Sequence, residues 1–343
     1  MNNFSYARAG SVGDAVREIG ANHGSQFIAG GTNLIDLMKE NVVRPSRLVD
    51  ITRLPLDSIE RTPEGGLRLG ALATNAETAY HSEVERRYPL LAKAILAGAS
   101  AQIRNMATNG GNLLQRTRCY YFYDTATGCN KRQPGSGCSA IEGFNRMHAI
   151  LGASDQCLAV HPSDMCVALA ALDAVVQIQG KRGKRSIPFA EFHRLPGDQP
   201  DLDNNLQPDE IITAIDLPPK GFAEHHAYLK IRDRSSFAFA LVSVAAALEM
   251  QGEIISEFRL ALGGVAHKPW RNRRAEELLQ GHKATRQNFE QVADMVLHGA
   301  QGFRYNAFKI GLARRAIVRG LIQAVEMESN NDHLFHRTTT EPR

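Results

Sequence analysis

The spacing of hydrophobic residues changes several times along this 343-residue chain and divides it into three units. At the start, Phe4 and Tyr6 alternate with small or polar residues as in a short strand, and Ser11 precedes a stretch with helical apolar spacing. The following patterns predict a strand at 27–29, a helix-like stretch at 34–39 and a strand at 47–51. The pattern therefore predicts a small β-α-β-β unit over residues 1–55.

The second unit, residues 56–219, opens with a hairpin pattern and ends at Pro218 and Pro219. Ile59, Leu67 and Leu69 belong to the predicted hairpin. Further apolar periods predict strands at 175–178 and 210–217, and helices at 75–80, at 89–99 and from Ser163. The third unit, residues 220–325, shows strand patterns at 227–231, 240–249 and 254–262, then helical patterns at 275–279, 288–298 and 307–324. Because strands and helices are segregated, the predicted fold class is α+β. Residues 326–343 are polar and are predicted to form a tail.

Composition narrows the function classes. The net charge of +4 is not gathered into one long basic run, so nucleic acid is not an expected partner. No apolar run reaches the roughly 18 residues that span a bilayer, so membrane insertion is not expected. The first eight residues lack the apolar segment of a secretory signal, which makes the cytoplasm the default location.

Two glycine pairs lie at predicted turns. Gly30 and Gly31 follow a strand and precede Thr32, Asn33 and a helix-like stretch, which suits a backbone that approaches a pyrophosphate. The loop is not GxGxxG, and alone it is equally consistent with an ordinary tight turn. The second pair lies in residues 108–112, Thr-Asn-Gly-Gly-Asn. Together the two loops predict a dinucleotide held between two units.

Four of the five cysteines cluster between two turn-rich stretches. They are Cys119, Cys129, Cys138 and Cys157. Their spacing lacks the CxxC pairs that are typical of structural zinc sites, so an iron–sulfur cluster is favoured and zinc is left open. The aromatic run at 120–123 is equally consistent with shielding of a cluster and with ordinary core packing. Cys166, at an apolar helix position, is predicted to be a buried free thiol.

Other polar residues have structural explanations beside functional ones. Asp164 suits either a ribityl hydroxyl or the first turn of a helix. Lys230 suits either a flavin edge or a nearby carboxylate. His161 and His193 are isolated in the sequence, and structural histidines are the expected reading.

These motifs resemble one known family, the FAD-binding subunits of molybdenum hydroxylases such as xanthine dehydrogenases, carbon monoxide dehydrogenases and aldehyde oxidoreductases. The resemblance covers about residues 1–325 and rests on residues 28–34, 103–113, 161–164 and 230–231. It implies a two-part FAD domain of the vanillyl-alcohol-oxidase (PCMH) type, followed by a C-terminal α+β domain of the carbon monoxide dehydrogenase flavoprotein type. The FAD contacts that it implies are Gln26, Phe27, Ile28, Ala29, Gly30, Gly31, Thr32, Asn33, Leu34, Thr108, Gly111, Asn112, Asp164 and Lys230. Asn33 departs from the aspartate of many members.

The cysteine insertion, at about 115–160, resembles a minority branch of the family that carries a [4Fe–4S] cluster, and it implies Cys119, Cys129, Cys138 and Cys157 as the ligands. The family also implies a [2Fe–2S] small subunit and a molybdenum-cofactor large subunit as partners, with an external electron acceptor. The expected function is electron transfer, and no residue here is predicted to act on the organic substrate. Resemblance to the branch with a periplasmic aldehyde oxidoreductase narrowly favours the periplasm, reached by export with a signal-bearing partner.

Two other functions remain open from the residues. One is a flavin oxidase of the same fold that works alone, although no convincing catalytic base is found. The other is a non-enzymatic redox module that binds a metal or cluster.

Overall fold

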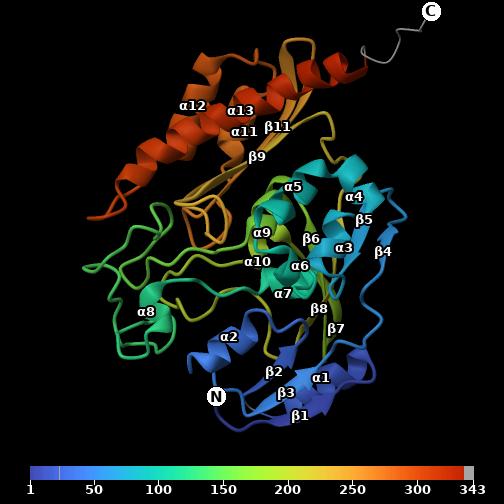
Figure 1. Ribbon diagram of the computed structural model, residues 1–343, viewed down its shortest axis with the longest axis vertical. Helices are drawn as coiled ribbons and strands as arrows, with labels where there is room; N and C mark the ends of the chain where they lie inside the picture. Colours follow the sequence, from blue (N-terminus) through green and yellow to red (C-terminus); the bar gives the residue numbers. More distant parts are fainter. Residues whose placement is uncertain (23, 336–343) are drawn as a thin grey trace, which may run out of the picture.

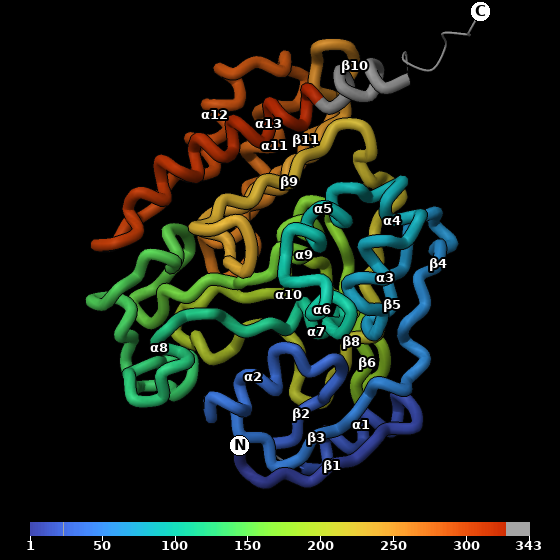
Figure 2. The backbone as a smooth tube through the Cα atoms, viewed as in Figure 1, coloured from blue at the N-terminus to red at the C-terminus, as the bar shows by residue number. Residues whose placement is uncertain are grey.

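The computed structural model describes residues 1–22 and 24–335. It contains three sheets that follow one another in chain order. Figures 1 and 2 show the N-terminal unit at one end, the C-terminal unit at the other and the second unit between them. The green insertion projects to one side, where it reaches both terminal units.

The N-terminal unit is a parallel three-stranded sheet with order β1-β3-β2. Its elements are β1 (Ser5–Arg8), α1 (Val12–Ala21), β2 (Ser25–Ile28), α2 (Leu34–Lys39) and β3 (Arg47–Asp50). Ser11 caps α1 by accepting a hydrogen bond from the Asp14 amide, and Ala15, Val16 and Ile19 bury the apolar face of this helix. The helix-like stretch predicted at 34–39 is confirmed as α2, so the predicted β-α-β-β order is corrected to β-α-β-α-β. Helix α2 makes a second crossover, because parallel neighbours cannot be joined by a hairpin.

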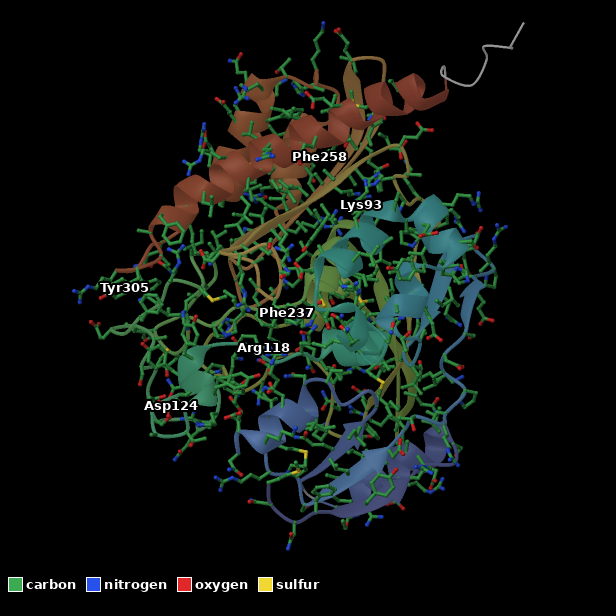
Figure 3. All side chains as sticks on the ribbon, viewed as in Figure 1. Lys93, Arg118, Asp124, Phe237, Phe258 and Tyr305 are labelled. Atoms are coloured by element: carbon green, nitrogen blue, oxygen red, sulfur yellow. The ribbon has the colours of Figure 1, made fainter. Side chains whose placement is uncertain are left out.

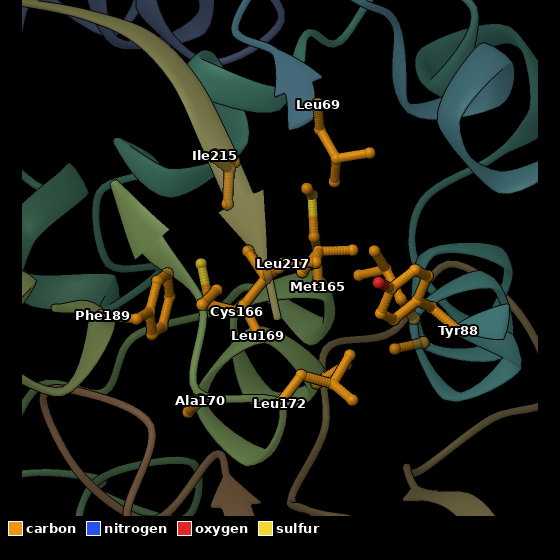
Figure 4. Packing of buried hydrophobic residues seen from close by; sticks show 14 of the residues in the cluster. Leu69, Tyr88, Met165, Cys166, Leu169, Ala170, Leu172, Phe189, Ile215 and Leu217 are labelled. Atoms are coloured by element: carbon orange, nitrogen blue, oxygen red, sulfur yellow. The ribbon is translucent and has the colours of Figure 1, made fainter. Parts of the chain in front are cut away.

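The second unit is an antiparallel sheet with order β4-β5-β8-β6-β7, covered by short helices. Its strands are β4 (Ile59–Arg61), β5 (Leu67–Gly70), β6 (Val175–Gly180), β7 (Gly183–Pro188) and β8 (Ile211–Leu217). Its helices are α3 (Asn75–Ala79), α4 (Ser82–Arg87), α5 (Pro89–Ala97), α6 (Ala101–Arg104), α7 (Asn109–Leu113), α8 (Tyr120–Tyr123), α9 (Asp164–Ala171) and α10 (Phe189–Phe192). Figure 4 shows side chains of α9 packed among Leu69, Ile215 and Leu217 of the sheet. Cys166 is fully buried there as a free thiol, as the sequence predicted.

The C-terminal unit is an antiparallel sheet with order β11-β10-β9 and three helices. Its elements are β9 (His225–Ile231), β10 (Val242–Gln251), β11 (Ile254–Gly263), α11 (Arg273–Leu279), α12 (Arg286–Val296) and α13 (Phe308–Phe335). The structure explains why β10 is rich in alanine. Ala245 and Ala247 face the core of the second unit, whereas Ala246 faces the core under α13. Small side chains allow both layers to approach this strand closely.

Helix α13 continues to Phe335, so the stretch 326–335 of the predicted tail is helical, and the remaining residues 336–343 lie outside the described residues. Among the described helices, none is both long and apolar enough to cross a lipid bilayer.

Candidate cofactor sites

A cavity of about 350 Å³ opens where the N-terminal unit meets the second unit. Its wall includes the unbroken run 25–34, with the first glycine pair at its centre, and also Thr108, Gly110 and Gly111 of the second pair. The structure thus places eleven of the predicted FAD contacts around one cavity: Gln26, Phe27, Ile28, Ala29, Gly30, Gly31, Thr32, Asn33, Leu34, Thr108 and Gly111. We call this space the large cavity.

The first loop connects the carboxyl end of β2 to α2, and its glycines are required by geometry. Gly31 has a φ of +71°, a conformation that favours glycine. A Cβ atom at Gly30 would collide with the carbonyl oxygen of Met106, so the two loops touch through their main chains. Close packing of bare backbone at a cavity wall is what a pyrophosphate site needs.

Two buried polar atoms mark the large cavity as a polar-ligand site. The Ser25 hydroxyl and the Asn33 side-chain nitrogen have no hydrogen-bond partner within the described part of the chain. Buried polar groups are normally paired, so unpaired ones at a cavity wall indicate a missing ligand or water. The side-chain oxygen of Asn33 has a partner, the main-chain N–H of Arg116 at 2.9 Å. These features fit the phosphates and hydroxyls of FAD.

The second loop is held by buried asparagines. Thr108 caps α7 by accepting a hydrogen bond from the Gly111 amide, and the fully buried Asn109 donates to the Gly70 carbonyl at 3.1 Å. Asn112 is absent from the wall of the large cavity. It donates to Asn75 Oδ1 at 2.6 Å and accepts from the Ser163 hydroxyl at 2.5 Å. The structure therefore gives Asn112 the role of joining the second loop to the start of α9.

Asp164 and Lys230 lie away from the large cavity, and they form a buried ion pair. Lys230 Nζ is 2.7 Å from Asp164 Oδ2, and both side chains are less than a tenth exposed. The hydroxyl of Tyr228 donates to the other carboxylate oxygen at 2.6 Å. Burial and the neighbouring carboxylate raise the pKa of Tyr228 well above its usual range, so the hydroxyl keeps its proton. Asp164 also lines a second, smaller cavity of about 20 Å³, together with Cys119 and Ser163.

His161 and His193, which were interpreted from the sequence as structural histidines, are buried side by side. His193 Nε2 lies 2.8 Å from the Leu113 carbonyl oxygen, and His161 Nε2 lies 3.4 Å from the same atom. Burial lowers the pKa of both imidazoles, so they are neutral near pH 7. They therefore brace the end of α7.

The four clustered cysteines come together in the insertion, which has α8 as its one helix among the described elements. They share an apolar pocket with Phe122, Ala140 and Leu158, and all four thiols are free. Cys129 and Cys138 face each other in a short antiparallel bridge. A hydrogen bond from the Cys157 thiol lowers the pKa of Cys138 to about 6, whereas burial raises the pKa of Cys119 to about 12. Four thiols that form no disulfide, one of which ionises readily, fit the donor set of an iron–sulfur cluster.

Three functional candidates were not predicted from the sequence, because no residue pattern around them indicates which groups they contact. His148 Nε2 lies 3.1 Å from Cys119 Sγ, and burial lowers the pKa of this imidazole to about 4. Arg116 lines the large cavity, and the buried Lys131 lies two residues after Cys129. The one sequence signal that could have found these residues was a count of the charged residues inside the insertion.

Arg118 fixes the insertion between the two terminal units. Its guanidinium donates to Asp36 Oδ2 of α2 at 2.9 Å and lies 5.2 Å from the ring centre of Phe239, just before β10. Figure 3 shows Arg118 and Phe237 near the middle of the molecule, while Asp124 and Tyr305 lie toward the outer side. The insertion thus spans the region between the two cavities.

Comparison with known proteins agrees with this architecture. Residues 2–220 match the family described as the FAD binding domain in molybdopterin dehydrogenase, and residues 227–321 match the CO dehydrogenase flavoprotein C-terminal domain. The chain is 49% identical over 326 residues to the aldehyde oxidoreductase FAD-binding subunit PaoB of Escherichia coli K12, which covers 94% of this chain and 99% of the relative.

More distant relatives also align with most of this chain. The glyceraldehyde dehydrogenase medium chain of Sulfolobus acidocaldarius is 28% identical over 294 residues, 85% of this chain and 86% of the relative. A solved carbon monoxide dehydrogenase of Hydrogenophaga pseudoflava aligns with a TM-score of 0.74 and 23% identity over 95% of this chain and 98% of that chain, which shows the common fold.

Proposed function

The chain belongs to the FAD-binding subunits of the molybdenum hydroxylases, and from this premise we propose that it is the electron-transfer subunit of a complex that oxidises aldehydes or N-heterocycles. It accepts electrons from a [2Fe–2S] partner subunit, which a molybdenum-cofactor subunit reduces, and it passes them to an external acceptor. Support comes from the family match over residues 2–220 and from the 49% identity to an aldehyde oxidoreductase subunit. Substrate chemistry belongs to the partner.

The chain's own work in this proposal is to bind, orient and isolate the flavin. Bound FAD supplies the exchange between one-electron and two-electron transfer. The residues 25–34, Thr108 and Gly111 hold the dinucleotide through main-chain groups, the Ser25 hydroxyl and the Asn33 side-chain nitrogen, two groups that have no partner among the described residues. Asp164 presents a carboxylate in the small cavity, where the contacts from Lys230 and Tyr228 fix its orientation.

We further propose that Cys119, Cys129, Cys138 and Cys157 hold a [4Fe–4S] cluster. The observation that carries this proposal is the gathering of four free thiols in one apolar pocket, although up to 38 residues of chain separate them. Cys119 also lines the small cavity that contains Asp164. A cluster at these thiols lies beside the proposed flavin site, which suits electron transfer between the two.

The test is metal and spectroscopic analysis of the purified complex. We expect about four irons and four labile sulfides per chain beyond those of the [2Fe–2S] subunit, with a cubane signal in low-temperature EPR during a redox titration. Cys138→Ser removes this iron and signal, whereas the matched control Cys166→Ala changes a buried thiol outside the pocket and keeps both. Zinc in place of iron, or unchanged iron in Cys138→Ser, contradicts the assignment. Aldehyde turnover by the isolated chain contradicts the electron-transfer role.

For location, we propose the periplasm, reached by export of the folded complex with a signal-bearing partner. The support is the resemblance to the aldehyde oxidoreductase branch. Cell fractionation with and without the partner's leader tests it: the chain is expected to move to the cytoplasm when the leader is deleted. A chain that stays in the cytoplasm in both cases contradicts the proposal.

A further inference from the structure

Arg116 is the one lysine or arginine among the described residues that line the large cavity. Its main-chain N–H donates to Asn33 of the first glycine loop at 2.9 Å. Its guanidinium lies 4.8 Å from the ring centre of the fully buried Phe122 and donates to Asp203 Oδ2 at 2.7 Å. A cation held this firmly at the wall of a dinucleotide cavity is placed to attract a pyrophosphate.

The other carboxylate oxygen of Asp203 accepts from the cysteine insertion. Lys131 Nζ donates to Asp203 Oδ1 at 2.5 Å and to the Pro200 carbonyl at 2.6 Å. The Lys131 side chain is 1% exposed, so its charge is poorly screened. One carboxylate therefore joins a cation at the FAD cavity to a cation inside the insertion.

The chain of contacts from Arg116 through Asp203 ends at Lys131, close to the cysteines of the insertion. Lys131 follows Cys129 by two residues, so the main chain connects its position directly to a proposed cluster ligand. Arg116 Nη2 also donates to the Lys131 carbonyl at 3.4 Å. The segment that carries Cys129 is therefore tied to Arg116 through both main chain and side chain.

The charges of the link do not cancel. Burial alone raises the pKa of Asp203, but Lys131 and Arg116 outweigh it and lower this pKa to about 2, so the carboxylate is ionised near neutral pH. Two cations and one anion leave one net positive charge. That charge lies between two sites that each receive negative groups, the pyrophosphate and the thiolates.

We propose that Arg116, Asp203 and Lys131 couple the two cofactor sites, so that a filled cysteine site strengthens FAD binding and bound FAD strengthens cluster retention by the same factor. The inference rests on the proposed cluster. Ligation at Cys129 fixes the adjoining Lys131, which holds Asp203, which orients Arg116 toward the cavity. FAD then binds without the entropic cost of ordering this chain of contacts. Reciprocity follows because the coupling is one free energy.

The experiment measures FAD affinity in the purified complex by flavin fluorescence, with the cluster intact and after its removal by a chelator and oxidant. We expect cluster removal to weaken FAD binding on the order of tenfold, within the usual range for coupled sites. In Asp203→Asn the affinity ratio between the two forms falls close to one. The matched control is Asp201→Asn, two residues away, because Asp201 meets Arg116 through its main-chain carbonyl; it keeps the wild-type ratio.

A reciprocal measurement on the wild type needs no variant and covers the case in which Asp203→Asn does not fold. Cluster retention at equilibrium with a graded chelator series, followed by EPR, is expected to strengthen by the same factor when FAD is bound. The coupling is overturned, while the proposed function stands, if FAD affinity is the same with and without the cluster. It is also overturned if the ratio of these two affinities in Asp203→Asn equals the wild-type ratio. A complex that binds FAD but holds no cubane overturns the proposed cluster, and the coupling with it.

Discussion

The first glycine loop and the cysteine insertion form neighbouring sites by opposite means. The glycine loop lies at the edge of a parallel sheet, and its shape comes from main-chain geometry, as the positive φ of Gly31 and the contact of Gly30 with Met106 show. The insertion contains a single four-residue helix among its described residues, and side chains hold it in place. A site shaped by the main chain loses its ligand when a new side chain fills the space between two backbone segments. A site held by side chains loses its order when one of the side chains that anchor it is removed.

The anchors of the insertion come from the units around it. Arg118 reaches Asp36 in the N-terminal unit, while Asn306 and Lys309 from the C-terminal unit both donate to the His148 carbonyl. Inside the insertion, Arg132 donates to the carbonyls of Tyr121 and Phe122, close to Cys119. Long polar side chains thus replace the sheet ladders that order the glycine loop.

For FAD binding, the largest expected effect is on the backbone-built site. In Gly30→Ala the new methyl group meets the Met106 carbonyl oxygen, so the two loops must separate. Strain of this kind typically costs about 1–3 kcal/mol, which corresponds to roughly a 5- to 150-fold loss of FAD affinity. FAD per chain, measured by absorbance after gel filtration, reports it. The control Gly13→Ala, in α1, places its methyl group 3.7 Å from the nearest atom and keeps FAD. Full FAD content in Gly30→Ala would refute the contact.

For local stability, a separate quantity from FAD affinity, the largest expected effect is on the anchor-built site. Phe122 is fully buried in the insertion under the Arg116 guanidinium. Phe122→Ala removes this support, and we expect a loss of about 3–5 kcal/mol in local stability. Hydrogen exchange measured by mass spectrometry is expected to rise across residues 115–160 and to stay constant in β1–β3. Tyr120→Ala, at a side chain that is half exposed, serves as the control with an effect below about 1 kcal/mol. Equal exchange in both variants would mean that Phe122 does not hold the insertion.

A pH effect tests the contact between the insertion and α13. Burial, aided by the charge of Arg146, lowers the pKa of Lys309 from 10.5 to about 7. Between these two values the unfolded chain binds a proton that the folded chain does not. The free energy of unfolding therefore rises with pH in this window, by at most about 1.4 kcal/mol per pH unit. Urea unfolding at several pH values measures the slope.

Two variants isolate the contribution of Lys309. Lys309→Met removes the titrating group and flattens the pH slope, and it also lowers stability because the carbonyls of His148 and Gly264 lose their donor. Lys283→Met, at an exposed lysine paired with Glu253, is expected to keep the slope. A slope that survives in Lys309→Met would assign it to another group.

The smallest expected effect concerns a single hydrogen bond to FAD. Ser25→Ala removes the hydroxyl that is unpaired within the described residues, and we expect FAD affinity to fall by roughly three- to tenfold, the value of one neutral hydrogen bond. Fluorescence titration of the FAD-depleted complex measures it. The control Ser5→Ala changes an exposed hydroxyl on β1 that bonds the Ser46 carbonyl. An unchanged affinity in Ser25→Ala would place the ligand elsewhere in the cavity.

Much of the local structure could be predicted from the sequence. The strands around Leu67, Val176 and Leu260 and the caps at Ser11 and Ser163 follow from apolar period and capping chemistry, which act over a few residues. The β-α-β-β order was wrong because it left out the helix-like stretch at 34–39, which was itself predicted and forms the six-residue α2. The contacts of Asn112 with Asn75 and Ser163 were missed because no local pattern encodes partners 37 and 51 residues away.

The sequence by itself determined the identity of the groups available for chemistry: two glycine pairs, four clustered cysteines, and the family to which they belong. Only the tertiary structure decided which groups meet. It paired Asp164 with Lys230 across 66 residues and Arg116 with Asp203 across 87. The physical reason is that turn and strand preferences act locally, whereas a buried charge takes whichever partner the packed units bring within reach. The link between the cysteine insertion and the FAD cavity is a property of that packing.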